Sequence, residues 1–194
     1  MSNEIRIYAA CLAAYNNGIL HGSWIDCGGK DADDIGEEVR AMLAKSPIEN
    51  AEEWAIHDYE CPDQLRGQFS EYMGLDKVAT LASLGELMDQ GDHYAAGVAL
   101  ALDRMSGTWD ATDVESWIDD HYAGESSFGP AGWCETWLEE MGDLEGVPEN
   151  LRFYIDFEAY ARDTAMNGDV EFVDADGDHV PHDSHTDCFA FYAH

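Results

Sequence analysis

The amino-acid sequence predicts an α+β protein made of three small parts, in which short strands and amphipathic helices occupy different stretches of the chain. Three observations predict this class. Apolar residues recur at helical spacing in several segments, runs rich in Ile, Tyr, Val or Phe lie near both ends, and Gly or Pro separates the segments. The 194 residues suffice for one compact domain or for two to three small ones.

The first part, residues 1–60, is expected to form a small antiparallel sheet with one helix. Strands are predicted over residues 4–12, 19–27 and 54–59, and the chain reverses at 13–18, where Asn and Gly tolerate positive φ. The helix is predicted over residues 33–45. Its apolar residues share one face, which comprises Ile35, Val39, Met42 and Leu43. The helix is expected to stop before Pro47, because proline restricts the backbone of the residue before it.

The second part, residues 61–105, is expected to form a bundle of short helices. Its apolar residues recur at helical spacing and are divided at Gly74, Gly85 and Gly91. The third part, residues 106–194, is expected to hold two acidic helices, a further helix between Pro148 and Met166, and a pair of strands over 170–173 and 188–192. Gly168 stands at a favoured position for capping the end of a helix.

The first acidic helix is predicted over residues 112–122, because its apolar and acidic residues fall on opposite faces. Thr112 followed by Glu115 has the form of a capping box, which marks the expected start. The apolar face comprises Val114, Trp117, Ile118 and Tyr122.

The second acidic helix is predicted to follow Pro130, a favoured first-turn residue. Its inward face comprises Trp133, Cys134, Trp137, Leu138 and Met141. The rise of a helix gives roughly one charge per 3 Å on the acidic faces, close to the spacing of about 3.4 Å between phosphates on one DNA strand.

Between residues 105 and 151 the chain has twelve acidic residues and no Lys or Arg, yet it is rich in aromatic residues. Disordered acidic segments have few aromatic residues, so we expect this one to fold and to hold its carboxylates in fixed positions. The carboxylates expected to contact a partner are Asp110, Asp113, Glu115, Asp119, Asp120, Glu125, Glu135, Glu139, Glu140, Asp143 and Glu145.

The whole chain has 41 acidic and 9 basic residues, a formal net charge of −32. Such a charge costs stability through self-repulsion and repels nucleic acids and anionic membranes, so we expect a positively charged protein surface as the partner. No signal peptide or membrane-spanning run is recognisable, which predicts a cytosolic protein. The five cysteines are far apart and form no C-x-x-C pair, so we expect them to be reduced packing residues.

No motif predicts an enzyme, a cofactor or a metal site. The segment 174–178 places its Gly too early for a calcium loop, and we expect a polar turn there. His179, His182 and His185 surround Pro181, which disfavours the helix that would align them as metal ligands. Residues 124–129 do not satisfy G-x-S-x-G, and no phosphate-binding glycine loop is present. We therefore expect a non-enzymatic protein.

Four stretches of the sequence resemble the ArdA family of antirestriction proteins. They are residues 6–26 (RIYAACLAAYNNGILHGSWID), 53–60 (EWAIHDYE), 122–125 (YAGE) and 154–163 (YIDFEAYARD). They occur in the expected order over nearly the whole chain, and the first is the most specific. Residues 174–194, with their His-rich loop, do not fit the family pattern.

The resemblance implies an elongated, three-part α+β protein that dimerises and imitates the shape and charge of bent duplex DNA. Such a protein occupies the DNA-binding groove of type I restriction-modification enzymes, specifically their methyltransferase core, and protects an incoming mobile genetic element. Two other hypotheses fit the charge. One is an acidic chaperone or scavenger of basic DNA-binding proteins, and the other is a salt-adapted enzyme.

A homodimer is also expected because closed twofold assemblies are the commonest oligomers and one chain covers only about half of a long two-part DNA site at this charge density. We expect the interface in the C-terminal third. The candidate residues are Phe128, Trp133 and Trp137, each of which could equally pack inside its own chain.

Overall fold

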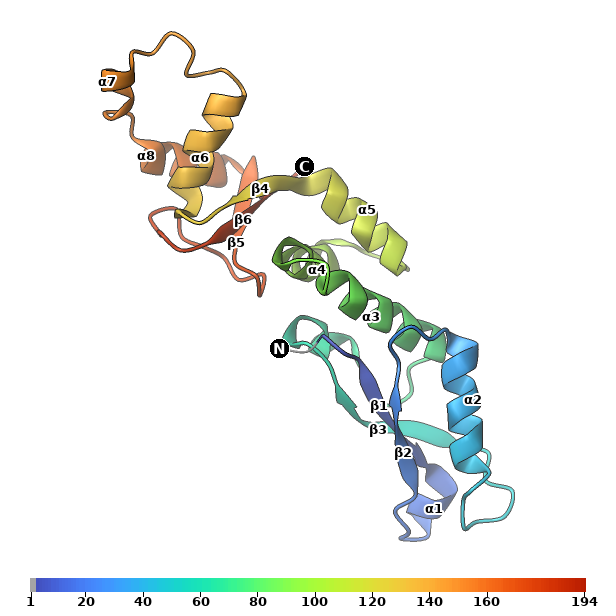
Figure 1. Cartoon of the computed structure of the whole chain (residues 1–194). Helices are drawn as coiled ribbons and strands as arrows, with labels where there is room; N and C mark the ends of the chain where they lie inside the picture. Colours follow the sequence, from blue (N-terminus) through green and yellow to red (C-terminus); the bar gives the residue numbers. More distant parts are fainter. Residues whose placement is uncertain (1–2) are drawn as a thin grey trace. The chain divides into compact units, whose positions relative to one another are not determined.

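The computed structural model describes residues 3–194, whose contacts divide into two compact units. The first unit comprises the chain up to Gly91 together with Thr108–Thr112, and the second comprises Asp92–Gly107 and Asp113–His194. Each unit contains one three-stranded antiparallel sheet and several helices (Figure 1). The predicted α+β class is confirmed, whereas the finer division into parts at residues 60 and 105 stays a prediction.

The sheet of the first unit has the order β2-β1-β3. These strands are β1 (Arg6–Cys11), β2 (Gly22–Asp26) and β3 (Trp54–Glu60). All three predicted strands are confirmed, but the second begins three residues later than expected. Its predicted first residues, Ile19 and Leu20, are 40% and 87% exposed. The predicted reversal contains a single helical turn, α1 (Leu12–Asn16), followed by Gly18 at φ 74°.

Helix α2 (Ala32–Leu43) confirms the predicted helix of the first unit and packs on β1, β2 and α3. The carboxylate of Asp31 accepts a hydrogen bond of 2.9 Å from the Asp34 N–H and so caps its first turn. Ile35, Val39 and Met42 are buried, as their spacing predicts.

The remaining elements of the first unit are η1 (Asp63–Gln68) and α3 (Leu75–Met88). The expected break at Gly85 is wrong, because α3 runs through it. Any Cβ at Gly85 would collide with the backbone oxygen of Asn3, so the glycine serves a close approach of two chain segments. Residues 108–112 return to this unit, where the ammonium of Lys77 lies 3.1 Å from the ring centroid of Trp109.

The sheet of the second unit has the order β4-β6-β5, with β4 (Tyr122–Ser126), β5 (Val170–Val173) and β6 (Cys188–Tyr192). The predicted pair of β5 and β6 is confirmed, and β4 was not expected. The helices are α4 (Asp92–Arg104), α5 (Ala111–His121), α6 (Gly129–Glu140), α7 (Glu149–Arg152) and α8 (Phe157–Asn167). The division of the chain into units falls within α5.

The helix expected between Pro148 and Met166 is α8, and a separate short helix, α7, precedes it. The side chain of Asp156 accepts a hydrogen bond from the Ala159 N–H and starts α8. Gly168 ends α8 in the left-handed conformation, as predicted.

The central strand β6 is buried on both sides and joins two parts of the core. Cys188 and Ala190 belong to an apolar cluster between the sheet and helices α6 and α8. The alternate residue Phe191 contacts the rings of Trp117 and Tyr122. The cluster consists of Trp133, Cys134, Ala161, Val170, Phe172, Val180, Cys188 and Ala190.

The loop between β5 and β6 begins with the predicted polar turn. The Asp174 carboxylate accepts hydrogen bonds of 2.9 and 3.0 Å from the N–H groups of Asp176 and Asp178. Within residues 3–194 no group of His, Cys, Asp and Glu has the arrangement of a metal site, and the five cysteines are free thiols. No helix in the described part of the chain is long and apolar enough to cross a membrane.

Candidate partner-binding surface

Helix α5 presents its acidic face outward. Val114 and Ile118 are fully buried, and Gly97 of α4 leaves room for the Ile118 side chain. Asp113, Asp119 and Asp120 are exposed, as the helical spacing predicts, whereas Glu115 is half-buried. The helix begins at Ala111, so Thr112 lies inside it and the expected capping box at Thr112 is wrong.

Helix α6 is arranged in the same way. Trp133, Cys134 and Leu138 are buried, while its acidic residues Glu135, Glu139 and Glu140 are exposed. Asp143 and Glu145 are also exposed in the turns that follow. Met141 was expected to face inward but is 64% exposed, because α6 ends at Glu140 and the helical period does not continue beyond it.

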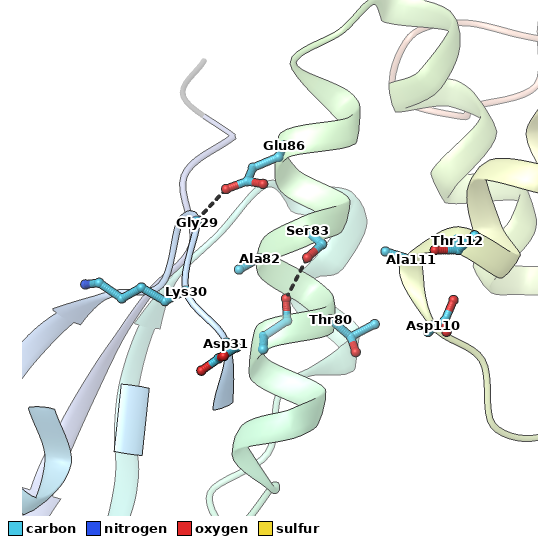
Figure 2. A pocket seen from close by; sticks show the side chains of 11 residues that line it. Gly29, Lys30, Asp31, Thr80, Ala82, Ser83, Glu86, Asp110, Ala111 and Thr112 are labelled. Carbon is cyan, nitrogen blue, oxygen red and sulfur yellow. Dashed lines mark hydrogen bonds between the residues drawn. The ribbon is translucent and has the colours of Figure 1, made fainter. Parts of the chain in front are cut away.

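Ten of the eleven candidate carboxylates are thus exposed, and Glu115 is half-buried. All except Asp110 belong to the second unit. Asp110 instead lines a hollow of about 520 Å³ in the first unit, together with Asp31 and Glu86 (Figure 2). One predicted carboxylate therefore lies apart from the others in the fold.

The hollow in the first unit is polar, but its groups are engaged in local hydrogen bonds (Figure 2). The Glu86 carboxylate accepts from the Gly29 N–H, and the hydroxyls of Ser83 and Thr80 donate to carbonyls one turn earlier in α3. Nucleophilic catalysis requires a nucleophile that is paired with a base. No such pair occurs among the residues that line the hollow.

Acidic residues outnumber basic ones most strongly in the second unit, which has 23 acidic and 3 basic residues and a formal charge of −20. Each of its three arginines lies against a carboxylate. Arg152 contacts Glu139 at 2.6 Å, Arg162 contacts Asp163 at 2.9 Å, and Arg104 contacts Glu171. The positive charges are therefore already compensated within the chain, and the excess carboxylates define the potential of this unit.

Two tyrosines beside these helices have raised pKa values, chiefly through burial and further through nearby carboxylates. Burial, followed by the charge of Glu125 and a hydrogen bond of 3.3 Å to its carboxylate, raises the pKa of Tyr122 to about 12. Burial, followed by the charges of Asp119 and Glu115, raises the pKa of Tyr94. Both shifts have the expected direction, because ionisation of either tyrosine would place a further negative charge near carboxylates.

The three residues proposed for a dimer interface lie in different environments. Trp133 is only 4% exposed, and its indole N–H donates to the Ala123 carbonyl at 3.0 Å. Trp137 is half-buried and its ring centroid lies 5.8 Å from that of Trp133, whereas Phe128 is 78% exposed. Phe153 and Tyr154, which were not among the interface candidates, are 88% and 80% exposed between α7 and α8.

Comparison with known protein families matches residues 7–177 to the antirestriction protein ArdA. The chain belongs to the ArdA family of antirestriction proteins. The match confirms the resemblance seen in the four sequence stretches. It ends in the polar turn after β5, so the central strand β6 of the second sheet lies outside the matched part of this ArdA chain. No curated protein matched the chain.

Proposed function

We propose that this ArdA protein inhibits a type I restriction-modification enzyme by placing its carboxylates in the groove where the methyltransferase core binds DNA. The observation that supports this mechanism is the excess of exposed carboxylates on α5, α6 and the turns after them, in a unit whose arginines are already paired. A groove that binds DNA carries Lys and Arg to neutralise phosphates, and fixed carboxylates can take the same positions.

The proposed inhibitor acts without catalysis and needs no cofactor. Its binding releases counterions from the carboxylates and from the basic groove, so the affinity falls steeply as salt rises. Long-range attraction between the −32 protein and a basic groove accelerates the encounter. The place of action is the cytosol, where the restriction enzyme meets an incoming mobile element.

We also propose that the active form is a homodimer with Phe128 at the interface. Phe128 is the most exposed of the three candidate aromatic residues, and a large exposed aromatic side chain gains most from burial against a second chain. Sedimentation velocity at micromolar concentration tests this proposal. Phe128→Ser should shift the protein toward the monomer, and a wild-type protein that sediments as a monomer contradicts it.

The mechanism is tested by competition between the protein and a fluorescent duplex containing the recognition site for a purified type I methyltransferase core. The duplex should be displaced in proportion to the protein added, without formation of a ternary complex. Hen egg-white lysozyme serves as a basic control protein of unrelated shape. Equal trapping of lysozyme and the methyltransferase core at physiological salt would support the acidic scavenger instead.

A further inference from the structure

One edge of the first sheet is open. Hydrogen bonds of 2.9 Å from the Cys11 N–H to the His21 carbonyl and from the Cys27 N–H to the Ile5 carbonyl fix the register of β1 and β2. In an antiparallel pair the main-chain groups of successive residues point alternately toward and away from the partner strand. The residues of β2 whose main-chain groups point away from β1 are therefore Gly22, Trp24 and Asp26.

The other sheet edges are partly covered by the chain itself. The Ile56 N–H of β3 donates to Glu71, the Phe172 carbonyl of β5 accepts from the Val180 N–H, and the Ala123 carbonyl of β4 accepts from the Trp133 indole. On β2 the Lys30 ammonium donates a hydrogen bond to the Asp26 carbonyl. The outward main-chain groups of Gly22 and Trp24 have no hydrogen-bond partner within residues 3–194.

A groove follows this open edge, because helix α2 runs beside β2 (Figure 1). One hollow of about 260 Å³ lies between residues 21–24 and the α2 side, which contributes Glu38, Ala41 and Met42. A second hollow of about 540 Å³ extends along α2 past Glu37 and Asp34. The two hollows are adjacent, because Glu38 and Ala41 line both of them.

Side-chain contacts hold the two walls of the groove together at both ends. At one end the His21 ring nitrogen Nε2 lies 2.9 Å from the Met42 carbonyl oxygen. At the other end the Lys30 ammonium contacts the Glu38 carboxylate at 2.6 Å and the carbonyl of Asp26. A groove with fixed walls binds an extended segment without the entropic cost of ordering a loop.

The chemistry of the groove defines its ligand. The α2 wall carries Asp34, Glu37 and Glu38, whereas Lys30 is engaged with Glu38 and Lys45 lies at the far end beside His21. Side chains of an added strand alternate, so every second one faces this acidic wall. The others lie on the opposite side of the sheet, next to Trp24, whose ring centroid is 5.6 Å from that of Tyr8.

We propose that this groove binds an extended segment of a protein partner by strand addition to β2. The segment has basic side chains facing α2 and apolar side chains beside Trp24, and its main chain pairs with Gly22 and Trp24. This site belongs to the first unit and uses none of the carboxylates of α5 and α6, so it goes beyond the proposed inhibition.

A pair of synthetic peptides tests the proposal on the full-length protein. The probe is an acetylated and amidated heptapeptide that alternates Arg and Val, and the control peptide has Pro in place of each Val. Both carry the same charge, but Pro has no N–H to donate to a strand. At 0.3 M NaCl the Val peptide should bind at least about tenfold more tightly, the loss expected for two main-chain hydrogen bonds.

The site is located by amide chemical shifts in nuclear magnetic resonance spectra. The Val peptide should shift the amides of Gly22, Trp24 and the exposed side of α2. Ala41→Trp fills the groove from an exposed position and should abolish these shifts, whereas Ala41→Ser should retain them.

Equal affinity for the two peptides overturns the proposal, as do shifts confined to α5 and α6. The peptide comparison uses the wild-type protein and does not depend on the folding of Ala41→Trp. Concentration-dependent shifts of the Gly22 and Trp24 amides without peptide also overturn it, because they assign the edge to a second copy of the chain.

Discussion

The two units have the same architecture but distribute charge differently. Each consists of a three-stranded antiparallel sheet with helices, yet the first has 18 acidic and 6 basic residues, a charge of −12, and the second has a charge of −20. In the first unit basic and acidic residues pair across the surface, as in Arg6–Glu60 and Arg66–Asp63. A three-stranded antiparallel sheet therefore underlies both units, although the second unit carries the larger negative charge.

This arrangement explains how so acidic a chain folds. No charged residue within residues 3–194 is buried, so the carboxylates avoid the cost of desolvation. Their mutual repulsion acts through water, where it is weak and screened by salt. Each unit retains an apolar core, built around Ile7 and Leu81 in the first and Trp133 and Phe172 in the second.

Reversal of the charges on the acidic face of α5 should reduce inhibition more than the other changes below. It should also distinguish the contributions of the two units to inhibition. A variant with four acid-to-Lys changes on this helix should lose inhibition by at least about a hundredfold, since each reversal also introduces repulsion. The changes are at Asp113, Glu115, Asp119 and Asp120. Inhibition titrations and circular dichroism measure the loss and the retained fold.

The matched control makes the same change in net charge on the first unit. Its four exposed positions are Glu49, Glu52, Glu53 and Glu71. This variant should inhibit within about threefold of the wild type, since long-range attraction alone is lost. Equal loss in both variants would show that total charge, and not the α5 surface, determines inhibition.

In the second unit, substitution of a core aromatic residue should lower the free energy of unfolding by several kcal/mol more than substitution of a surface aromatic residue. Trp133→Ala removes a buried ring and its hydrogen bond to Ala123, so the free energy of unfolding should fall by about 3–5 kcal/mol. Phe128→Ala should change it by less than about 0.5 kcal/mol in the monomer. Urea unfolding at low protein concentration measures both values, and similar losses would contradict the assigned environments.

Alkaline pH should weaken the second unit through Tyr122. Its pKa is raised from 10.0 to about 12 in the folded state, so the neutral phenol stabilises the fold fully below pH 10. This contribution is lost as pH rises from about 10 to 12. Melting temperatures between pH 9 and 12 should fall more steeply for the wild type than for Tyr122→Phe. Parallel curves would contradict the assignment.

A single reversal should have the smallest effect. Glu140→Lys changes one exposed carboxylate among many, which is worth about 0.5 kcal/mol, or roughly a two- to threefold loss of affinity for the methyltransferase core. Isothermal titration calorimetry against that core checks the value. Complete loss of binding would show that a single dominant contact, and not a distributed surface, determines the affinity.

The sequence predicts local elements better than their assembly. The faces of α2, α5 and α6 follow from helical spacing, because burial of one face imposes that spacing. Strand β4 was missed because it contains Gly124 and pairs with β6 more than sixty residues later in the chain. Gly85 within α3 was interpreted as a break. The structure requires glycine there because the Asn3 backbone approaches closely, and this contact comes from outside the helix.

The candidate site shows the same limit. Exposure of the acidic residues on α5 and α6 could be predicted from their position opposite an apolar face. The position of Asp110 in the first unit could not, because it depends on the return of residues 108–112 to α3 and on the contact of Trp109 with Lys77. No local pattern encodes that return.

The central claim is that carboxylates of the second unit replace DNA phosphates in a basic groove. The most direct measurement is the dissociation constant of the complex with the methyltransferase core over a series of NaCl concentrations. The affinity should fall by about 10³-fold or more between 50 and 200 mM, in parallel with that of the specific duplex. An affinity independent of salt, or a complex that holds the protein and the duplex together, would contradict the claim.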